Sequence, residues 1–231
     1  METSRQPERP PASWFAHGRG RHLSERVLRE CTPELTRIFG HSGLYLRPSS
    51  DLTEALPGNM LAQVVSLHRE QDALGGPFRC RDGELPLESS SQSLVLALFV
   101  LESSEDGGAL VSEIGRILKP EGVAMLVVLN PWSPSRMQWW GRIGSPVGLG
   151  TLLAHVRDAG LETVRQRRLG PVWLRDEPKA VLDPPRPAWL DPVRAAALVV
   201  AQRREPGLTP LRATPTRLTR PAVIDPGAAP V

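Results

Sequence analysis

The chain has little of what marks secreted, membrane-spanning or metal-binding proteins. Its two cysteines, Cys31 and Cys80, lie too far apart for a metal or redox motif, and we expect reduced thiols in a cytoplasmic protein. Residues 1–14 lack the apolar core of a signal peptide. The longest apolar runs are Leu94–Leu101, Val123–Leu129 and Ala195–Ala201. Each is far shorter than the roughly 20 residues that cross a bilayer, so we expect no membrane span and no metal site.

The sequence also lacks a strong excess of charge of one sign. Its 28 basic and 25 acidic residues leave a net charge of +3, which gives little support for a nucleic-acid partner. Arginines do gather beyond Glu205, but no aromatic residues that could stack on bases accompany them. A solvated tail is therefore the favoured interpretation, and binding of RNA or DNA by the tail is the least favoured alternative.

Proline is abundant and divides the chain. The 24 prolines are concentrated toward the two ends, where they favour open chain over packed structure. We predict a disordered leader over residues 1–12, one domain over 13–205, and a Pro/Arg-rich tail over 206–231. The apolar fraction of 40% is sufficient for a folded core in that domain.

Periodicity predicts alternating strands and helices in the domain. Helical spacing of apolar residues begins at Leu23 and is interrupted by Pro33, which predicts two short helices or one kinked helix. Further helices are predicted over 52–56 (capped by Asp51), 109–118 and 149–159, the last closed by Gly160. Strands are predicted over 43–47, 61–67, 77–81, 93–101, 123–129, 161–167 and 195–203. Lys119–Gly122 is predicted to be a turn.

Such alternation is typical of an α/β fold. The fully apolar strands at 93–101 and 123–129 suit a sheet that is buried on both sides, so we expect a Rossmann-like, mostly parallel sheet with helices on both faces. Ligands bind such sheets beyond the carboxyl ends of the strands. The expected site therefore lies in the segments that follow Arg47, Leu67, Arg81, Phe99 and Leu129.

One segment, Arg81–Ser133, carries a more specific pattern. An acid (Asp82) precedes Leu-Pro-Leu, a buried strand ends in Val-Leu-Glu at Glu102, and a helix with Glu113 and Arg116 leads to Leu-Lys-Pro-Glu-Gly. This succession resembles class I S-adenosylmethionine (SAM) dependent methyltransferases of the methyltransferase type 11 branch. Trp14-Phe15, the Asn-Pro-Trp-Ser sequence at 130–133 and the segment 198–212 are similar to a divergent proteobacterial subfamily of that branch.

The resemblance implies a SAM site made by strand ends. Asp82 resembles the acid on the adenine side of the cofactor, although Asp82-Gly83 is equally well explained as a simple turn. The cofactor-binding residues implied in this way are Leu46, Arg47, Asp82, Gly83, Glu84 and Leu98. Glu113 and Arg116 are three residues apart on the predicted helix, and we expect them to form a structural ion pair.

The sequence departs from the family pattern at this site. The loop after the first strand, Leu46–Asp51, contains no glycine, although glycine is what lets the backbone approach the cofactor. The second strand is followed by His68-Arg69 where the family has an acid for the ribose, and Gln92-Ser93 replaces a Phe-Asp pair. These departures predict a degenerate SAM motif.

The expected function is therefore a SAM-dependent methyltransferase of unknown acceptor, and the departures leave open whether its activity is retained, weak or lost. The alternative is a catalytically inactive binding or scaffold protein with the same fold. No catalytic residue stands out; His41, His68 and His155 qualify as a general base by residue type alone. The apolar side chains Trp132, Met137, Trp139 and Trp140 suit either a substrate pocket or an apolar partner contact. The sequence determines neither the acceptor nor the oligomeric state.

Overall fold

The computed structural model describes residues 13–175 and 188–204. The predicted leader (1–12) and tail (206–231), together with part of the proline-rich stretch 171–192, lie outside the described residues.

A seven-stranded sheet runs through the domain in the order β3-β2-β1-β4-β5-β7-β6. Strands β1, β2, β4 and β5 are parallel, whereas β3 and β7 run antiparallel to their neighbours. The strands are β1 (Phe39–Arg47), β2 (Met60–Glu70), β3 (Ala73–Gly75), β4 (Gln92–Leu98), β5 (Leu118–Leu129), β6 (Glu162–Leu169) and β7 (Ala196–Gln202). The predicted Rossmann-like, mostly parallel sheet is confirmed.

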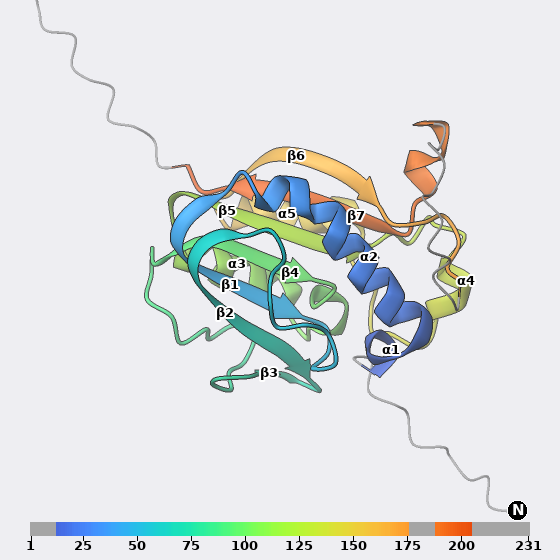
Figure 1. Ribbon diagram of the computed structural model, residues 1–231, viewed down its shortest axis with the longest axis horizontal. Coiled ribbons are helices and arrows are strands. Elements are labelled where there is room, and N and C mark those ends of the chain that lie inside the picture. The colour runs from blue at the N-terminus through green and yellow to red at the C-terminus, as the bar shows by residue number, and fades with distance from the viewer. Residues whose placement is uncertain (1–12, 176–187, 205–231) are drawn as a thin grey trace, which may run out of the picture.

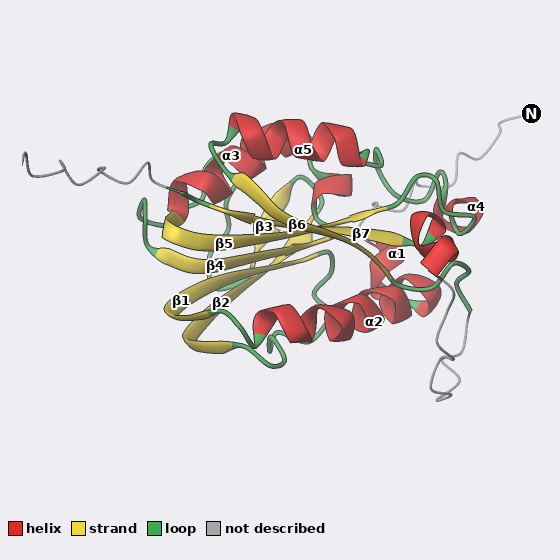
Figure 2. Ribbon diagram, turned by 90° about the horizontal axis from the view of Figure 1, so that it is seen from above, coloured by secondary structure: helices red, strands yellow, loops and turns green. Residues whose placement is uncertain are grey.

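Helices cover both faces of this sheet (Figure 2). Helices α1 (Ser13–Ala16) and α2 (Gly18–Leu35) lie on one face, and α3 (Gly107–Ile117) and α5 (Leu149–Asp158) lie on the other. A fifth helix, α4 (Arg136–Trp139), follows β5 at the rim, and the short 3₁₀ helices η1 (Leu101–Ser103) and η2 (Ala188–Val193) complete the described elements.

The alternation of side chains along β4 explains why both faces must be covered. Leu94, Leu96 and Leu98 belong to the hydrophobic core under α2, whereas Val95 and Ala97 belong to the core under α3 and α5. All five side chains are fully buried. A strand without polar residues on either face can be stable only between two helical layers.

Three sequence predictions of local structure are wrong. Of the two alternatives at Pro33, two short helices is wrong, because α2 is a single helix with Pro33 in its last turn, and β1 begins soon after at Phe39. The predicted helix over 52–56 is absent: the carbonyl of Leu52, which a helix would use, accepts a hydrogen bond from the Arg47 guanidinium. The predicted turn at Lys119–Gly122 lies within β5, where Glu121 adopts a positive φ of 62°.

The third strand was also misplaced by the sequence pattern. Strand β3 forms a tight hairpin with β2, turning at Gln71, whose φ is +46°. The predicted strand over 77–81 contributes a single bridge, between Cys80 and Leu74. Because β2 extends to Glu70, the chain turns back at once and pairs with β2 as β3. The segment 77–81, which was predicted to be a strand, forms a loop.

Helix α3 begins with a side-chain cap, which gives a first prediction. The carboxylate of Asp106 accepts a hydrogen bond of 2.9 Å from the Ala109 backbone N–H, satisfying one of the free donors of the first turn. We expect Asp106→Ala to lower the free energy of unfolding by about 1 kcal/mol, measured by urea denaturation. Asp106→Asn keeps the acceptor and should cost less; an equal loss in both variants would contradict the capping role.

Candidate cofactor site at the carboxyl edge of the sheet

The four parallel strands end at one edge of the sheet (Figure 1). Their last residues are Arg47 of β1, Glu70 of β2, Leu98 of β4 and Leu129 of β5. The loops that follow these strands, together with η1, form the surface at which an α/β sheet of this kind binds its ligand.

The side chain of Arg47 fills the loop that follows β1. It is 1% exposed, and its guanidinium donates to the carbonyl of Ser50 at 3.3 Å and to that of Leu52. It also pairs with Glu54 at 3.1 Å. Residues 48–56 include no glycine. Every residue of this loop therefore carries a side chain, and the backbone offers no open cradle for a ligand. The loop is therefore folded around a cation that belongs to the protein itself.

A second buried arginine, Arg69, lies near the end of β2, directly after His68. Arg69 donates to Asp82 Oδ1 at 2.7 Å and to the Val100 carbonyl at 3.2 Å. The other oxygen of Asp82 accepts from the Ser104 hydroxyl at 2.5 Å. The Arg69 side chain has no exposed surface, and Asp82 is 7% exposed. These contacts tie together the ends of β2 and β4 and the loop after β3.

A third buried charge-bearing group lies between β4 and β5. Glu102 in η1 is 1% exposed and accepts a 2.5 Å hydrogen bond from the Leu129 backbone N–H through Oε1. Among the described residues, Oε2 has no hydrogen-bond partner. Burial raises the pKa of this carboxyl to about 7, although the hydrogen bond from Leu129 opposes the rise. Burial therefore favours the neutral, protonated form of Glu102 over a wider pH range than for an exposed carboxyl.

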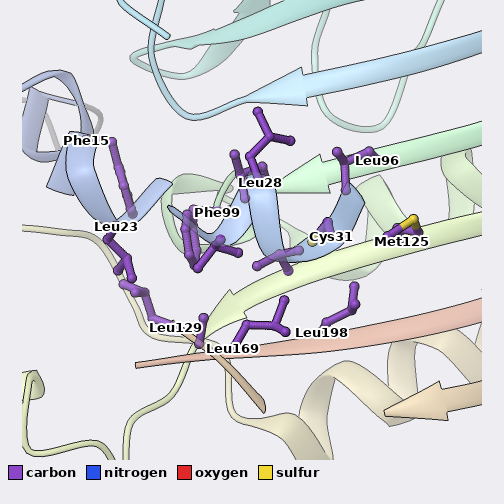
Figure 3. Packing of buried hydrophobic residues seen from close by; sticks show 14 of the residues in the cluster. Phe15, Leu23, Leu28, Cys31, Leu96, Phe99, Met125, Leu129, Leu169 and Leu198 are labelled. Carbon is purple, nitrogen blue, oxygen red and sulfur yellow. The ribbon is translucent and has the colours of Figure 1, made fainter. Parts of the chain in front are cut away.

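Helix α1 closes the edge above β4. Phe15 stacks on Phe99, with ring centroids 5.2 Å apart and planes 13° from parallel (Figure 3). Both rings are fully buried, and Phe99 adopts a φ of +51°, which is uncommon for a bulky residue. The residue after β4 therefore turns its ring under α1 instead of leaving a polar group at the strand end.

A pocket of about 350 Å³ remains beside Asp82. Its lining is mostly acidic and comes from the β2–β3 turn, the loop after β3 and the start of α3. The lining residues are Asp72, Arg81, Asp82, Gly83, Glu105 and Asp106.

The structure separates the six predicted cofactor residues. Asp82 and Gly83 line this pocket, and Glu84 is exposed nearby in sequence. Arg47 belongs to the cluster around Leu52 instead. The remaining two, Leu46 and Leu98, are fully buried on opposite faces of the sheet.

The predicted general-base candidates do not converge. His41 is exposed near the start of β1, and His155 lies on α5. His68 is the one of the three near the carboxyl edge, and its Nε2 lies 3.0 Å from Glu70 Oε1. Among the apolar candidates, Trp139 is fully buried, whereas Trp132, Met137 and Trp140 are exposed.

Sequence reasoning missed Arg69 as the partner of Asp82. A usable signal was present, because alternation in β2 puts Arg69 on the same face as the buried Leu67. A cation on a buried face requires an acid, and Asp82 was available. Glu102 was noticed only as part of a motif, since a sequence does not reveal which carboxylate loses its solvent.

Comparison with known proteins supports this interpretation of the fold. Residues 55–126 match the family described as methyltransferase domain. A SAM-dependent methyltransferase from Listeria monocytogenes superimposes with a TM-score of 0.58 at 12% identity, covering 80% of this chain and 100% of that one. No curated protein matches the sequence significantly.

Two further structures show the same architecture. A chain from the complex between the Haloferax volcanii Trm112 methyltransferase activator and a methyltransferase gives a TM-score of 0.56 at 17% identity, over 85% of this chain and 99% of that one. A SAM-dependent methyltransferase from Thermotoga maritima gives 0.54 at 14% identity, over 83% and 94%. The fold is thus that of the class I SAM-dependent methyltransferases. The family match is confined to residues 55–126, and a methyltransferase domain there implies SAM as cofactor and a methyl acceptor.

The residues at the carboxyl edge do not fit SAM in a pose that spans β1 and β4. The buried Arg47 guanidinium fills the loop after β1, and the Phe15–Phe99 stack covers the end of β4. Asp82 already accepts hydrogen bonds through both oxygens. Open space is present in the acidic pocket beside Asp82.

Proposed function

We propose that this chain represents a divergent methyltransferase subfamily in which SAM-dependent methyl transfer is weak or lost and the protein acts by binding. The observation that carries the proposal is the position of Arg47. A methyltransferase has to hold a sulfonium donor next to the acceptor in a fixed geometry. A guanidinium fixed in the loop after β1 brings a second positive charge to this place.

Opening that loop would be costly. The Arg47 guanidinium satisfies the carbonyls of Ser50 and Leu52, and displacing it would leave these two acceptors without that donor. A ligand can open the loop only by as much as its own differential affinity provides. The geometry therefore favours a loop that remains closed when SAM is present.

A second candidate function is methyl transfer with SAM held in a different pose. The pocket beside Asp82 supports it, because about 350 Å³ of space lies next to a carboxylate and the exposed Gly83. In this candidate Asp82 and Gly83 are the cofactor contacts, and Arg47 stays in its loop. The acceptor is not defined by any side chain at this edge.

Titration with SAM distinguishes the two candidates. We expect no measurable heat in calorimetry and a dissociation constant weaker than about 1 mM, so that 1 mM SAM adds less than about 0.4 kcal/mol to the free energy of unfolding. Micromolar binding together with methyl transfer to a cell extract would overturn the proposal.

Gly83→Val provides the matched variant. A Cβ at Gly83 would meet only the Ala109 side chain, at 3.6 Å, which is ordinary contact. The substitution should therefore preserve stability while narrowing the pocket. If the wild type does bind SAM, weaker binding by Gly83→Val assigns the cofactor to the pocket, and unchanged binding places it elsewhere.

A further inference from the structure

The surface beyond β5 exposes large apolar side chains that take little part in the core. Trp132 is 82% exposed, Met137 83%, Trp140 56% and Trp173 50%. We call these four residues the tryptophan face. Single exposed apolar residues are ordinary, but several together mark a contact surface.

Hydrogen bonds hold the segments of the tryptophan face against one another. Gln138 of α4 both donates to the Leu174 carbonyl and accepts from the Leu174 N–H, each at 3.1 Å. Ser133 also donates to the Val172 carbonyl, at 3.4 Å. The loop that carries Trp132 and α4 is therefore fixed to the loop that carries Trp173.

The buried Trp139 anchors α4 in the core. Its side chain has no exposed area and belongs to the core under α2. Gln138 and Trp140 flank this anchor in the sequence. Because Met137 and Trp139 belong to the same short helix, α4 cannot rotate to bury Met137 without removing Trp139 from the core. The exposure of the tryptophan face is thus a consequence of how α4 is docked.

Among the residues that the structure describes, the two segments that carry the tryptophan face include basic and no acidic side chains. Residues 130–148 contain Arg136 and Arg142 and no acid, and residues 170–175 contain Arg175 and no acid. The Arg136 guanidinium lies over the Trp140 ring, 3.6 Å from its centroid. This stacking holds the positive charge of Arg136 directly beside the amphipathic ring of Trp140.

The geometry points to the tryptophan face as a docking surface for an anionic lipid bilayer. Tryptophan rings prefer the interface between headgroups and acyl chains, and arginines beside them are attracted by anionic headgroups. Side chains that are more than 80% exposed project from the surface and are able to enter such an interface. The inference does not depend on whether SAM binds, since none of the four residues of the tryptophan face lines the pocket beside Asp82.

Association would be peripheral. No helix in the described ranges, 13–175 and 188–204, is long and apolar enough to cross a membrane. Membrane contact would therefore come from one rim of the folded domain, with Trp132 and Met137 entering the interface and Arg136 remaining at headgroup level.

Co-sedimentation with lipid vesicles tests the inference. We expect the full chain to bind vesicles of phosphatidylcholine with 30% phosphatidylglycerol, about tenfold or more tighter than phosphatidylcholine alone. The double variant Trp132→Ala/Met137→Ala should weaken this binding about tenfold or more. Arg142→Ala should weaken it about fivefold at low salt and less at high salt.

Phe39→Ala is the matched control. Phe39 is 72% exposed and begins β1, at the opposite edge of the sheet from the carboxyl end of β5. It should bind vesicles as the wild type does. Binding that Trp132→Ala/Met137→Ala leaves unchanged would overturn the inference. So would absent vesicle binding combined with concentration-dependent self-association that the double variant abolishes, which would make the face a protein contact.

Discussion

Replacing Asp82 with alanine is expected to lower the free energy of unfolding by about 3–5 kcal/mol, the range for removing one partner of a buried ion pair. The loss is large because the Arg69 side chain has no exposed surface and would keep its charge without a carboxylate. The hydrogen bond of Arg69 to the Val100 carbonyl, at 3.2 Å, would remain, but a neutral acceptor does not replace an anion. Urea denaturation at pH 7 measures the difference.

The double variant Arg69→Met/Asp82→Leu separates the pair from its surroundings. When both charges are replaced by apolar side chains of similar size, no buried charge is left without a partner, and stability should stay within about 1 kcal/mol of the wild type. Arg69→Met alone should cost less than Asp82→Ala, because the carboxylate keeps its hydrogen bond from Ser104. A loss below 1 kcal/mol for Asp82→Ala would mean that Arg69 reaches solvent.

The same pair shows how far the sequence could predict the site. Asp82 was predicted to lie at the carboxyl edge because its position before Leu-Pro-Leu matches a family pattern, and it lines the pocket there. Its partner was not predicted, since the pairing depends on the β2–β3 hairpin, and the sequence pattern put the third strand at 77–81 instead of Ala73–Gly75. An error in one strand thus concealed one salt bridge.

The fold itself was more accessible to prediction than the site. The central strands β4 and β5 are continuous apolar runs, and only a sheet buried on both faces accommodates them. Helix α5 was bounded correctly by its apolar spacing and by Gly160, whose φ is +71°. Such signals are local and survive without tertiary information.

The loop after β1 could be predicted only in part. The absence of glycine over Leu46–Asp51 indicated that the backbone would not form a close cradle. The inward turn of Arg47 and its hydrogen bonds to the carbonyls of Ser50 and Leu52 could not be predicted in this way. Arginines at strand ends usually extend into solvent, and here the three-dimensional course of the loop overrides that tendency.

Glu102 provides the second large expected effect, a change in how stability depends on pH. Burial raises the pKa of its carboxyl from 4.5 to about 7 in the folded state. Between these two values the unfolded chain has lost the proton while the folded protein still holds it. The free energy of unfolding contributed by Glu102 therefore falls as the pH rises from about 4.5 to 7, by about 3 kcal/mol in total, and is constant above that.

Glu102→Gln removes the titration and should reverse this loss. The amide oxygen can accept from the Leu129 N–H as Oε1 does, while the amide NH₂ takes the place of the unpartnered Oε2 at a cost of about 1 kcal/mol. From pH 5 to pH 8.5, the stability of the variant relative to the wild type should rise by about 2 kcal/mol. Chemical denaturation at several pH values measures this directly.

Glu113→Gln is the control with the opposite sign. The hydrogen bond from Arg116 lowers the pKa of Glu113, so the stability it contributes is present above its usual pKa and is lost only as the pH falls toward its lowered folded value. Between pH 5 and 8.5 the difference between Glu113→Gln and the wild type should stay nearly constant. If Glu102→Gln behaves in the same way, Glu102 is ionised throughout this range, and its second oxygen must have found a partner such as water.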